Sequence, residues 1–88
     1  MTSRATAGAE ARATLARALL TMATYGERPV CSDAPQLWIS DDAEDREGVK
    51  VWCQSCPLIE PCAAAGQFEK HGVWGGLDRT MRPGKEAA

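Results

Sequence analysis

The sequence predicts a small all-α domain that is stabilised by a metal held on its cysteines. The chain has 88 residues, and a domain of this size buries only about 60–65% of the surface that its unfolded chain exposes, so a hydrophobic core alone is marginal. Its few large apolar side chains mostly lie within a few residues of one of four cysteines or of Trp74. We therefore expect a small bundle of about three to four short helices around the cysteine site, followed by a Gly-Val-Trp-Gly-Gly turn. Residues 1–79 form the predicted domain, with an N-terminal helix and linker at 1–30, and residues 80–88 form a short, flexible, weakly basic tail.

The first predicted helix covers residues 4–25, which are rich in alanine. Leu15, Leu19 and Met22 follow the i, i+4, i+7 spacing of one helix face. Gly26 ends the segment as a C-terminal breaker. We expect this helix to cover the metal site, and docking to a partner is the alternative role.

Turn-forming residues dominate the next segment, residues 31–42, which we expect to be irregular. Asp41 or Asp42 is a suitable N-cap for a helix over residues 43–53, because a side-chain carboxylate accepts a hydrogen bond from the first free N–H groups. Pro57 ends that helix.

The last predicted helix begins near Pro61, because proline is tolerated in a first helical turn, and runs to His71 with Gly72 as its cap. The tight turn over residues 72–76 follows. We expect the tail from 80 to 88 to be disordered.

The four cysteines follow the pattern Cys31-x21-Cys53-x2-Cys56-x5-Cys62. A Cys-x2-Cys pair lets two thiolates converge on one metal or on two corners of a cluster. A structural zinc site usually has two such pairs, and only one is present here. An iron–sulfur cluster is larger and tolerates one pair plus two separated cysteines. The third alternative, a redox dithiol at Cys53 and Cys56, lacks the strand-then-helix context of thioredoxin-like proteins. The spacing favours a cluster and leaves the zinc module and the dithiol oxidoreductase open.

Charge and hydropathy limit where the chain acts. The sequence shows neither the apolar core of a signal peptide nor a membrane span, which predicts a cytoplasmic protein with reduced cysteines and no membrane contact. The net charge is −2, with −5 concentrated in residues 31–62. The only basic cluster is Arg79, Arg82 and Lys85. If the chain acts on DNA, we expect it to do so mainly through a protein partner.

Taken together, the cysteine spacing and the glycine–tryptophan turn resemble the WhiB-like family of actinobacteria and their phages. The similarity covers most of residues 31–79. The matching features are Cys31-Ser-Asp33 followed by Pro35, Leu37 and Trp38; Cys53-Gln-Ser-Cys56-Pro57; Cys62 before an alanine-rich helix; and Gly72-Val73-Trp74-Gly75-Gly76.

The resemblance implies a transcriptional regulator and not an enzyme. It implies a [4Fe–4S] cluster, responsive to oxygen or nitric oxide, on Cys31, Cys53, Cys56 and Cys62. It also implies docking on region 4, the C-terminal domain, of the primary sigma factor of RNA polymerase. In this sequence Val73 and Trp74 would make the contact, and Gly72, Gly75 and Gly76 would allow the turn.

The chain departs from the family most clearly after the turn, where many members have a run of arginine and lysine. Here Arg79, Arg82 and Lys85 are the only basic residues of that segment. With three charges the phosphate contribution to binding is small, so we expect direct contact with promoter DNA to be weak and salt-sensitive.

Overall fold

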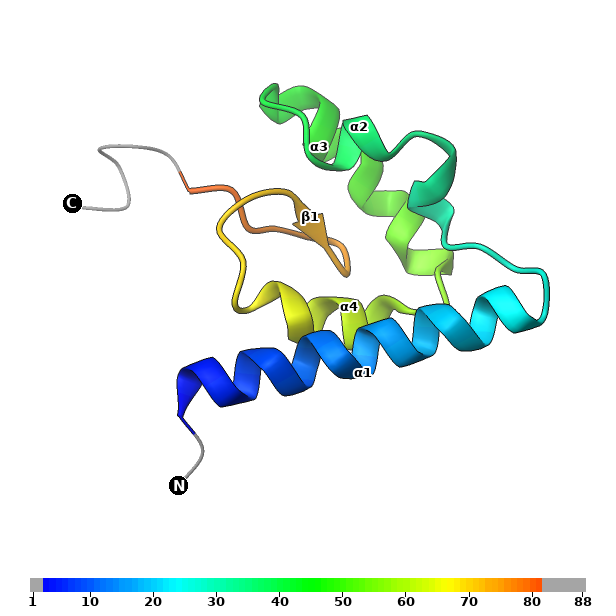
Figure 1. Ribbon diagram of the computed structural model, residues 1–88. Helices are drawn as coiled ribbons and strands as arrows, with labels where there is room; N and C mark the ends of the chain where they lie inside the picture. The colour runs from blue at the N-terminus through cyan, green and yellow to red at the C-terminus, as the bar shows by residue number, and fades with distance from the viewer. Residues whose placement is uncertain (1–2, 82–88) are drawn as a thin grey trace.

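The computed structural model describes residues 3–81, which are mostly helical (Figure 1). Four α-helices and two short 3-10 helices are followed by a two-stranded hairpin. In chain order these elements are α1 (Arg4–Thr24), η1 (Val30–Asp33), α2 (Pro35–Trp38), α3 (Ala43–Val49), η2 (Lys50–Ser55), α4 (Ile59–Gly66), β1 (Val73–Trp74) and β2 (Leu77–Asp78). None of the described helices is long and apolar enough to cross a membrane.

Helix α1 confirms the prediction for residues 4–25 almost residue for residue. Its first turn is capped by the Ser3 hydroxyl, which accepts a hydrogen bond from the Thr6 N–H at 3.1 Å. At the other end Gly26 adopts a left-handed φ of +72°, and the Glu27 N–H donates to the Met22 carbonyl at 2.9 Å. This is the arrangement by which glycine commonly closes a helix.

Helix α1 lies along α4, and the two form one layer of the molecule (Figure 1). The contact is close because Gly8 has no side chain: a Cβ there would lie 3.2 Å from the Phe68 ring. Arg4 adds a guanidinium group 4.8 Å from the centre of that ring, and its Nη2 donates to the Gln67 carbonyl at 2.9 Å. The N-terminal turns of α1 are therefore held in place.

The middle of the chain is more helical than expected. Residues 31–42 were expected to be irregular, but they contain η1 and α2 as single helical turns. Asp42 does cap α3, accepting from the Glu44 N–H at 2.9 Å. The single helix expected over 43–53 is an α-helix that ends at Val49 and continues as the tighter η2. Along η2, Cys53 lies in the core at 5% exposure.

Helix α4 is displaced towards the N-terminus relative to the prediction. It starts at Ile59, so Pro61 lies within the first turn, where no N–H is needed. It ends at Gly66 rather than His71, and the Trp74 side chain packs directly against the Gly66 backbone. A side chain at Gly66 would overlap Trp74, so the helix and the hairpin meet at this glycine.

The mostly helical fold is confirmed, and the hairpin adds two short strands to it. The sequence indicated a turn at residues 72–76, but the turn joins two short antiparallel strands with Trp74 opposite Leu77. Gly75 and Gly76 form the two-residue loop with φ values of +59° and +82°. Positive φ at both central positions defines a type I′ turn, which glycine forms most readily and which matches the twist of a hairpin.

A small core holds the hairpin and the cysteine segment, residues 30–56, together. It consists of Trp38, Val49, Cys53 and Val73, each at most 9% exposed. The first three come from α2, α3 and η2, whereas Val73 belongs to β1. The hairpin therefore contributes directly to the core of the cysteine segment.

Candidate metal centre and tryptophan hairpin

The four cysteines come from four different places in the fold. Cys31 lies in η1, Cys53 in η2, Cys56 directly after η2, and Cys62 in the first turn of α4. All four are free thiols; Cys53 is buried and the other three are half-buried. Residues that are 31 positions apart in the sequence thus supply one group of thiols.

The pKa directions of two of these thiols indicate that the four lie near one another. Burial raises the pKa of the Cys31 thiol, and the neighbouring Cys56 and Cys53 raise it further. Burial also raises the pKa of Cys62, the Gly75 N–H lowers it, and the other three cysteines raise it. Like charges in one site oppose ionisation, so four thiols here would be stabilised as thiolates by a shared cation or cluster.

Two N–H groups point at the sulfur atoms. The Trp38 indole Nε1 donates to Cys53 Sγ at 3.4 Å inside the core. The backbone N–H of Gly75 lowers the pKa of the Cys62 thiol and so favours its thiolate. Hydrogen bonds to ligand sulfurs are among the features that tune iron–sulfur clusters. The donor set therefore fits a thiolate-bound cluster.

A site for a single metal ion needs at least three ligand side chains arranged around one point. In the stretch from Ser3 to Met81, no three His, Cys, Asp or Glu side chains are arranged to hold one metal ion. The cysteine spacing, the mutual effect on pKa and the N–H donors are the observations that bear on a larger group. The assignment of the [4Fe–4S] cluster to these four residues stays a prediction.

The tryptophan hairpin packs against the helix that carries Cys62. A Cβ at Gly75 would lie 2.6 Å from both the Ile59 carbonyl oxygen and the Ala63 nitrogen. Trp74 is half-buried, packed on Gly66, and its Nε1 donates to the His71 carbonyl at 2.8 Å. The turn is therefore seated on α4, with part of the Trp74 ring open to solvent.

Val73 and Trp74 differ in exposure although they were predicted together as contact residues. Val73 is 6% exposed and belongs to the core, so its side chain supports the hairpin. Gly72, Gly75 and Gly76 all have positive φ, as their predicted role in the turn requires. The surface offered by this hairpin is thus the open edge of Trp74 together with Leu77, which is 49% exposed.

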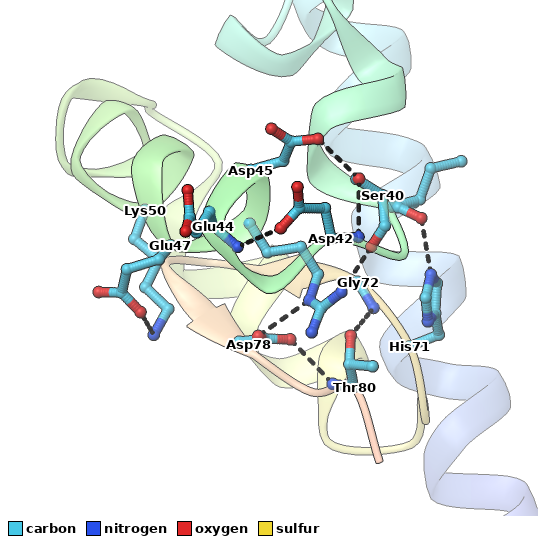
Figure 2. A network of polar contacts seen from close by, with 12 residues as sticks. Ser40, Asp42, Glu44, Asp45, Glu47, Lys50, His71, Gly72, Asp78 and Thr80 are labelled. Carbon is cyan, nitrogen blue, oxygen red and sulfur yellow. Dashed lines mark hydrogen bonds and ion pairs between the residues drawn. The ribbon is translucent and has the colours of Figure 1, made fainter. Parts of the chain in front are cut away.

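A buried ion pair joins the hairpin to the segment between Cys31 and Cys53. Arg46 in α3 is 4% exposed, and its Nε lies 3.0 Å from Asp78 Oδ2 in β2 (Figure 2). Its Nη1 donates to the Ser40 carbonyl at 2.6 Å. Burial alone would raise the pKa of Asp78, but the Thr80 N–H and Arg46 hold it below its ordinary value. The pair is ionised and fixes β2 against α3.

Further polar contacts close the base of the hairpin. The Gly72 N–H donates to Thr80 Oγ1 at 2.9 Å (Figure 2). The Arg79 N–H donates to the Gly72 carbonyl at 2.8 Å. His71 Nε2 lies 2.7 Å from the Ile39 carbonyl oxygen. The hairpin is thus wedged between α4, which carries Cys62, and the segment that follows Cys31.

The Arg46–Asp78 pair was not predicted from the sequence. Arg46 is the only cation in an otherwise acidic helix, and a solvated side chain is the ordinary expectation for such a residue. The pairing joins positions 32 residues apart. A basic residue among acids with an apolar neighbour such as Val49 was the one available signal.

The predicted nucleic-acid residues are only partly described. Arg79 is half-buried, and its Nε is buried with no hydrogen-bond partner among residues 3–81. Arg82 and Lys85 lie outside the described residues. Thr80 and the Met81 N–H, which donates to the Lys70 carbonyl at 3.1 Å, are hydrogen-bonded although the tail was expected to begin there.

Comparison with known proteins identifies the family. The family model described as transcription factor WhiB matches residues 25–84, which include all four cysteines and the hairpin. The chain belongs to the WhiB family. This confirms the resemblance seen in the sequence. No solved structure gives a significant match.

Two curated relatives support the assignment to the WhiB family. Both are named "Probable transcriptional regulator WhiB7", from Mycobacterium tuberculosis strains ATCC 25618 / H37Rv and CDC 1551 / Oshkosh. Each is 43% identical over 44 residues, a stretch that covers 48% of this chain and 48% of the relative. The alignment therefore spans about half the length of the curated relatives. A role in transcription is what the family and these names have in common.

Proposed function

We propose that this WhiB-family chain is a non-enzymatic transcriptional regulator that binds region 4 of the primary sigma factor through the Trp74 hairpin. Its four cysteines would hold a [4Fe–4S] cluster, and promoter DNA would be contacted weakly or through the sigma factor. The observation that carries the proposal is the position of the hairpin, which is held on both sides by segments that carry the cysteines.

The cluster and the protein chain would contribute different properties to the site. A bound cluster would supply an oxidisable link between Cys31, Cys53, Cys56 and Cys62, open to oxygen or nitric oxide. The chain itself places the Trp38 indole N–H 3.4 Å from Cys53 Sγ, and the Gly75 N–H lowers the pKa of the Cys62 thiol.

Gly75 belongs to both parts of the site. Its N–H hydrogen-bonds to Cys62, and its backbone packs on α4 beside Trp74. A change in the charge or position of the Cys62 sulfur would therefore act on the same turn that presents Trp74. This contact is the physical basis for coupling the state of the cysteines to partner binding.

Anaerobic purification followed by a binding titration tests the proposal. We expect a brown protein with iron and acid-labile sulfide that binds isolated region 4. Trp74→Ala should keep the cluster absorbance and weaken binding by at least about tenfold, because buried tryptophans are frequent interface hot spots. Leu20→Ala is the matched control, since Leu20 is 69% exposed on α1 and should bind unchanged.

Two results would contradict the proposal. One is undiminished binding of region 4 by Trp74→Ala with its absorbance intact. The other is a colourless protein containing one zinc and no sulfide, which would support the structural zinc module. Turnover with a disulfide substrate that survives mutation of Cys31 and Cys62 would instead support the dithiol oxidoreductase.

A further inference from the structure

A second apolar surface is lined by residues outside the Trp74 hairpin. It is a pocket of about 410 Å³ formed by η1, α2, α3 and η2. Its walls are mainly apolar and include Val30, Leu37, Trp38, Val49 and Trp52. No cysteine lines it, so it is distinct from the space between the thiols. Its volume falls within the range of about 300–1,000 Å³ that is typical of binding pockets.

Trp52 is the most unusual residue of this surface. It is 59% exposed, whereas Trp38, which also lines the pocket, is 9% exposed. Of the three tryptophans in the chain, Trp38 and Trp74 each donate their indole N–H within the fold. A large aromatic side chain at the edge of an apolar pocket is the composition typical of an interface anchor.

The charge around the pocket selects the kind of partner. Residues 30–55, which form it, carry a net charge of −4. Asp33 lies in the pocket wall with its side chain 79% exposed, and its pair with the exposed Arg28 at 3.3 Å is of the weak surface kind that a partner's cation can replace. The two cations of this segment are already engaged, Arg46 with Asp78 and Lys50 with Glu47. The field at the pocket is therefore negative and attracts a basic segment.

We propose that this pocket binds an apolar side chain of a basic amphipathic helix from a protein partner, with Trp52 as the anchor and Asp33 as the main charge contact. This recognition mode places an apolar helix face in a groove and cationic residues against its acidic rim. It is a different surface from the Trp74 hairpin and does not depend on the binding of region 4.

The position of Trp38 gives the pocket a connection to the cysteines. One side of its ring lines the pocket, and its Nε1 donates to Cys53 Sγ at 3.4 Å. Val30, Trp52 and Ser55 line the pocket and are direct sequence neighbours of Cys31, Cys53 and Cys56. A helix bound in the pocket would cover this side of the cysteine site.

The test uses the full chain, purified anaerobically, and a defined probe. The probe is an 18-residue fluorescent helical peptide with leucines on one face and lysines on the other. Its counterpart has glutamate in place of every lysine. Fluorescence anisotropy should detect binding of the lysine peptide, which weakens as salt is raised, and should detect none for the glutamate peptide.

Three variants locate the contact. Trp52→Ala should weaken binding of the lysine peptide by at least about tenfold, and Asp33→Lys by several-fold. Val51→Ala is the matched control, because Val51 is 67% exposed in the same short helix but does not line the pocket. We expect Val51→Ala to bind within about twofold of the unmodified chain, since isolated surface changes have small effects.

Other outcomes would overturn the proposal. Equal affinity of Trp52→Ala and Val51→Ala for the lysine peptide would show only a diffuse attraction of charge. Equal binding of the two peptides would remove the charge argument. A dimer that Trp52→Ala dissociates, without peptide binding, would assign the pocket to a second copy of the chain. Because region 4 is absent from this assay, its result is independent of the function proposed above.

Discussion

The layer of α1 and α4 and the cysteine segment, residues 30–56, are held together in different ways. Helix α1 has 21 residues, capped ends and a close contact at Gly8. The cysteine segment has only single turns and short helices, and its core within the segment is limited to Trp38, Val49 and Cys53. Large apolar side chains such as Ile39 and Trp52 stay 59% exposed in it.

The difference teaches that ordinary packing accounts for the helical layer but not for the cysteine segment. A segment with so small a core needs other constraints. Two are available in the structure: the hairpin, fixed by Arg46 and Asp78, and the four thiols that would share a bound group. Each can be removed separately, which makes the comparison open to experiment.

The largest expected effect follows from removing a thiol. Cys56→Ser should release the bound group. The amide hydrogens of α3 and η2 should then lose their protection from exchange, while α1 keeps its helical structure. Hydrogen exchange measured by mass spectrometry resolves the two regions. Val51→Ala, at a position of η2 that is 67% exposed, is the control and should change neither. Equal loss of protection in both regions would break the distinction.

A smaller effect is expected from the buried ion pair. Asp78→Asn keeps the shape of the side chain but leaves Arg46 at 4% exposure without its carboxylate. We expect a loss of about 3 kcal/mol in the free energy of unfolding, because an unpaired buried charge is costly. Glu47→Gln breaks the exposed pair with Lys50 and should cost less than about 1 kcal/mol. Urea titration of both variants measures the difference.

The same pair gives a pH dependence. The pKa of Asp78 is lower in the folded chain than its ordinary value, so its contribution is present above the unfolded pKa of about 3.9. It is lost as the pH falls through the lower, folded-state pKa. As the pH is lowered below about 4, the free energy of unfolding of Asp78→Asn should therefore fall less than that of the unmodified chain. Parallel acid curves for the two proteins would contradict this.

The smallest effects on stability are expected from replacing glycines by alanine, and their sign depends on where the glycine lies. Gly75→Ala should destabilise by about 2 kcal/mol, because φ is +59° and the added Cβ would meet α4 at 2.6 Å. In Gly48→Ala the new methyl group meets nothing within 4 Å and lies in α3. That variant should gain about 0.5–1 kcal/mol from helix propensity. Thermal unfolding of both variants provides the comparison.

Much of the fold could be predicted from local sequence patterns. Helix α1 and its glycine stop, the Asp42 cap and the glycine turn were all predicted, because capping and positive φ depend on residues only a few positions apart. Elements that depend on distant neighbours were missed or displaced. Helix α4 stops at Gly66, a residue that weakens a helix, and Trp74 packs against it from eight positions further along the chain. The glycine was a local signal for that end, whereas the packing of Trp74 on it depends on the fold.

The candidate site divides in the same way. The sequence by itself determined the family, the four thiols and their spacing, and the glycines that allow the hairpin turn. Only the tertiary structure decided that Val73 is a core residue, that Arg46 pairs with Asp78, and that Gly75 reaches the sulfur of Cys62. The physical reason is range. Spacing and backbone conformation are properties of neighbouring residues, whereas burial and ion pairing depend on which distant segments the fold brings together.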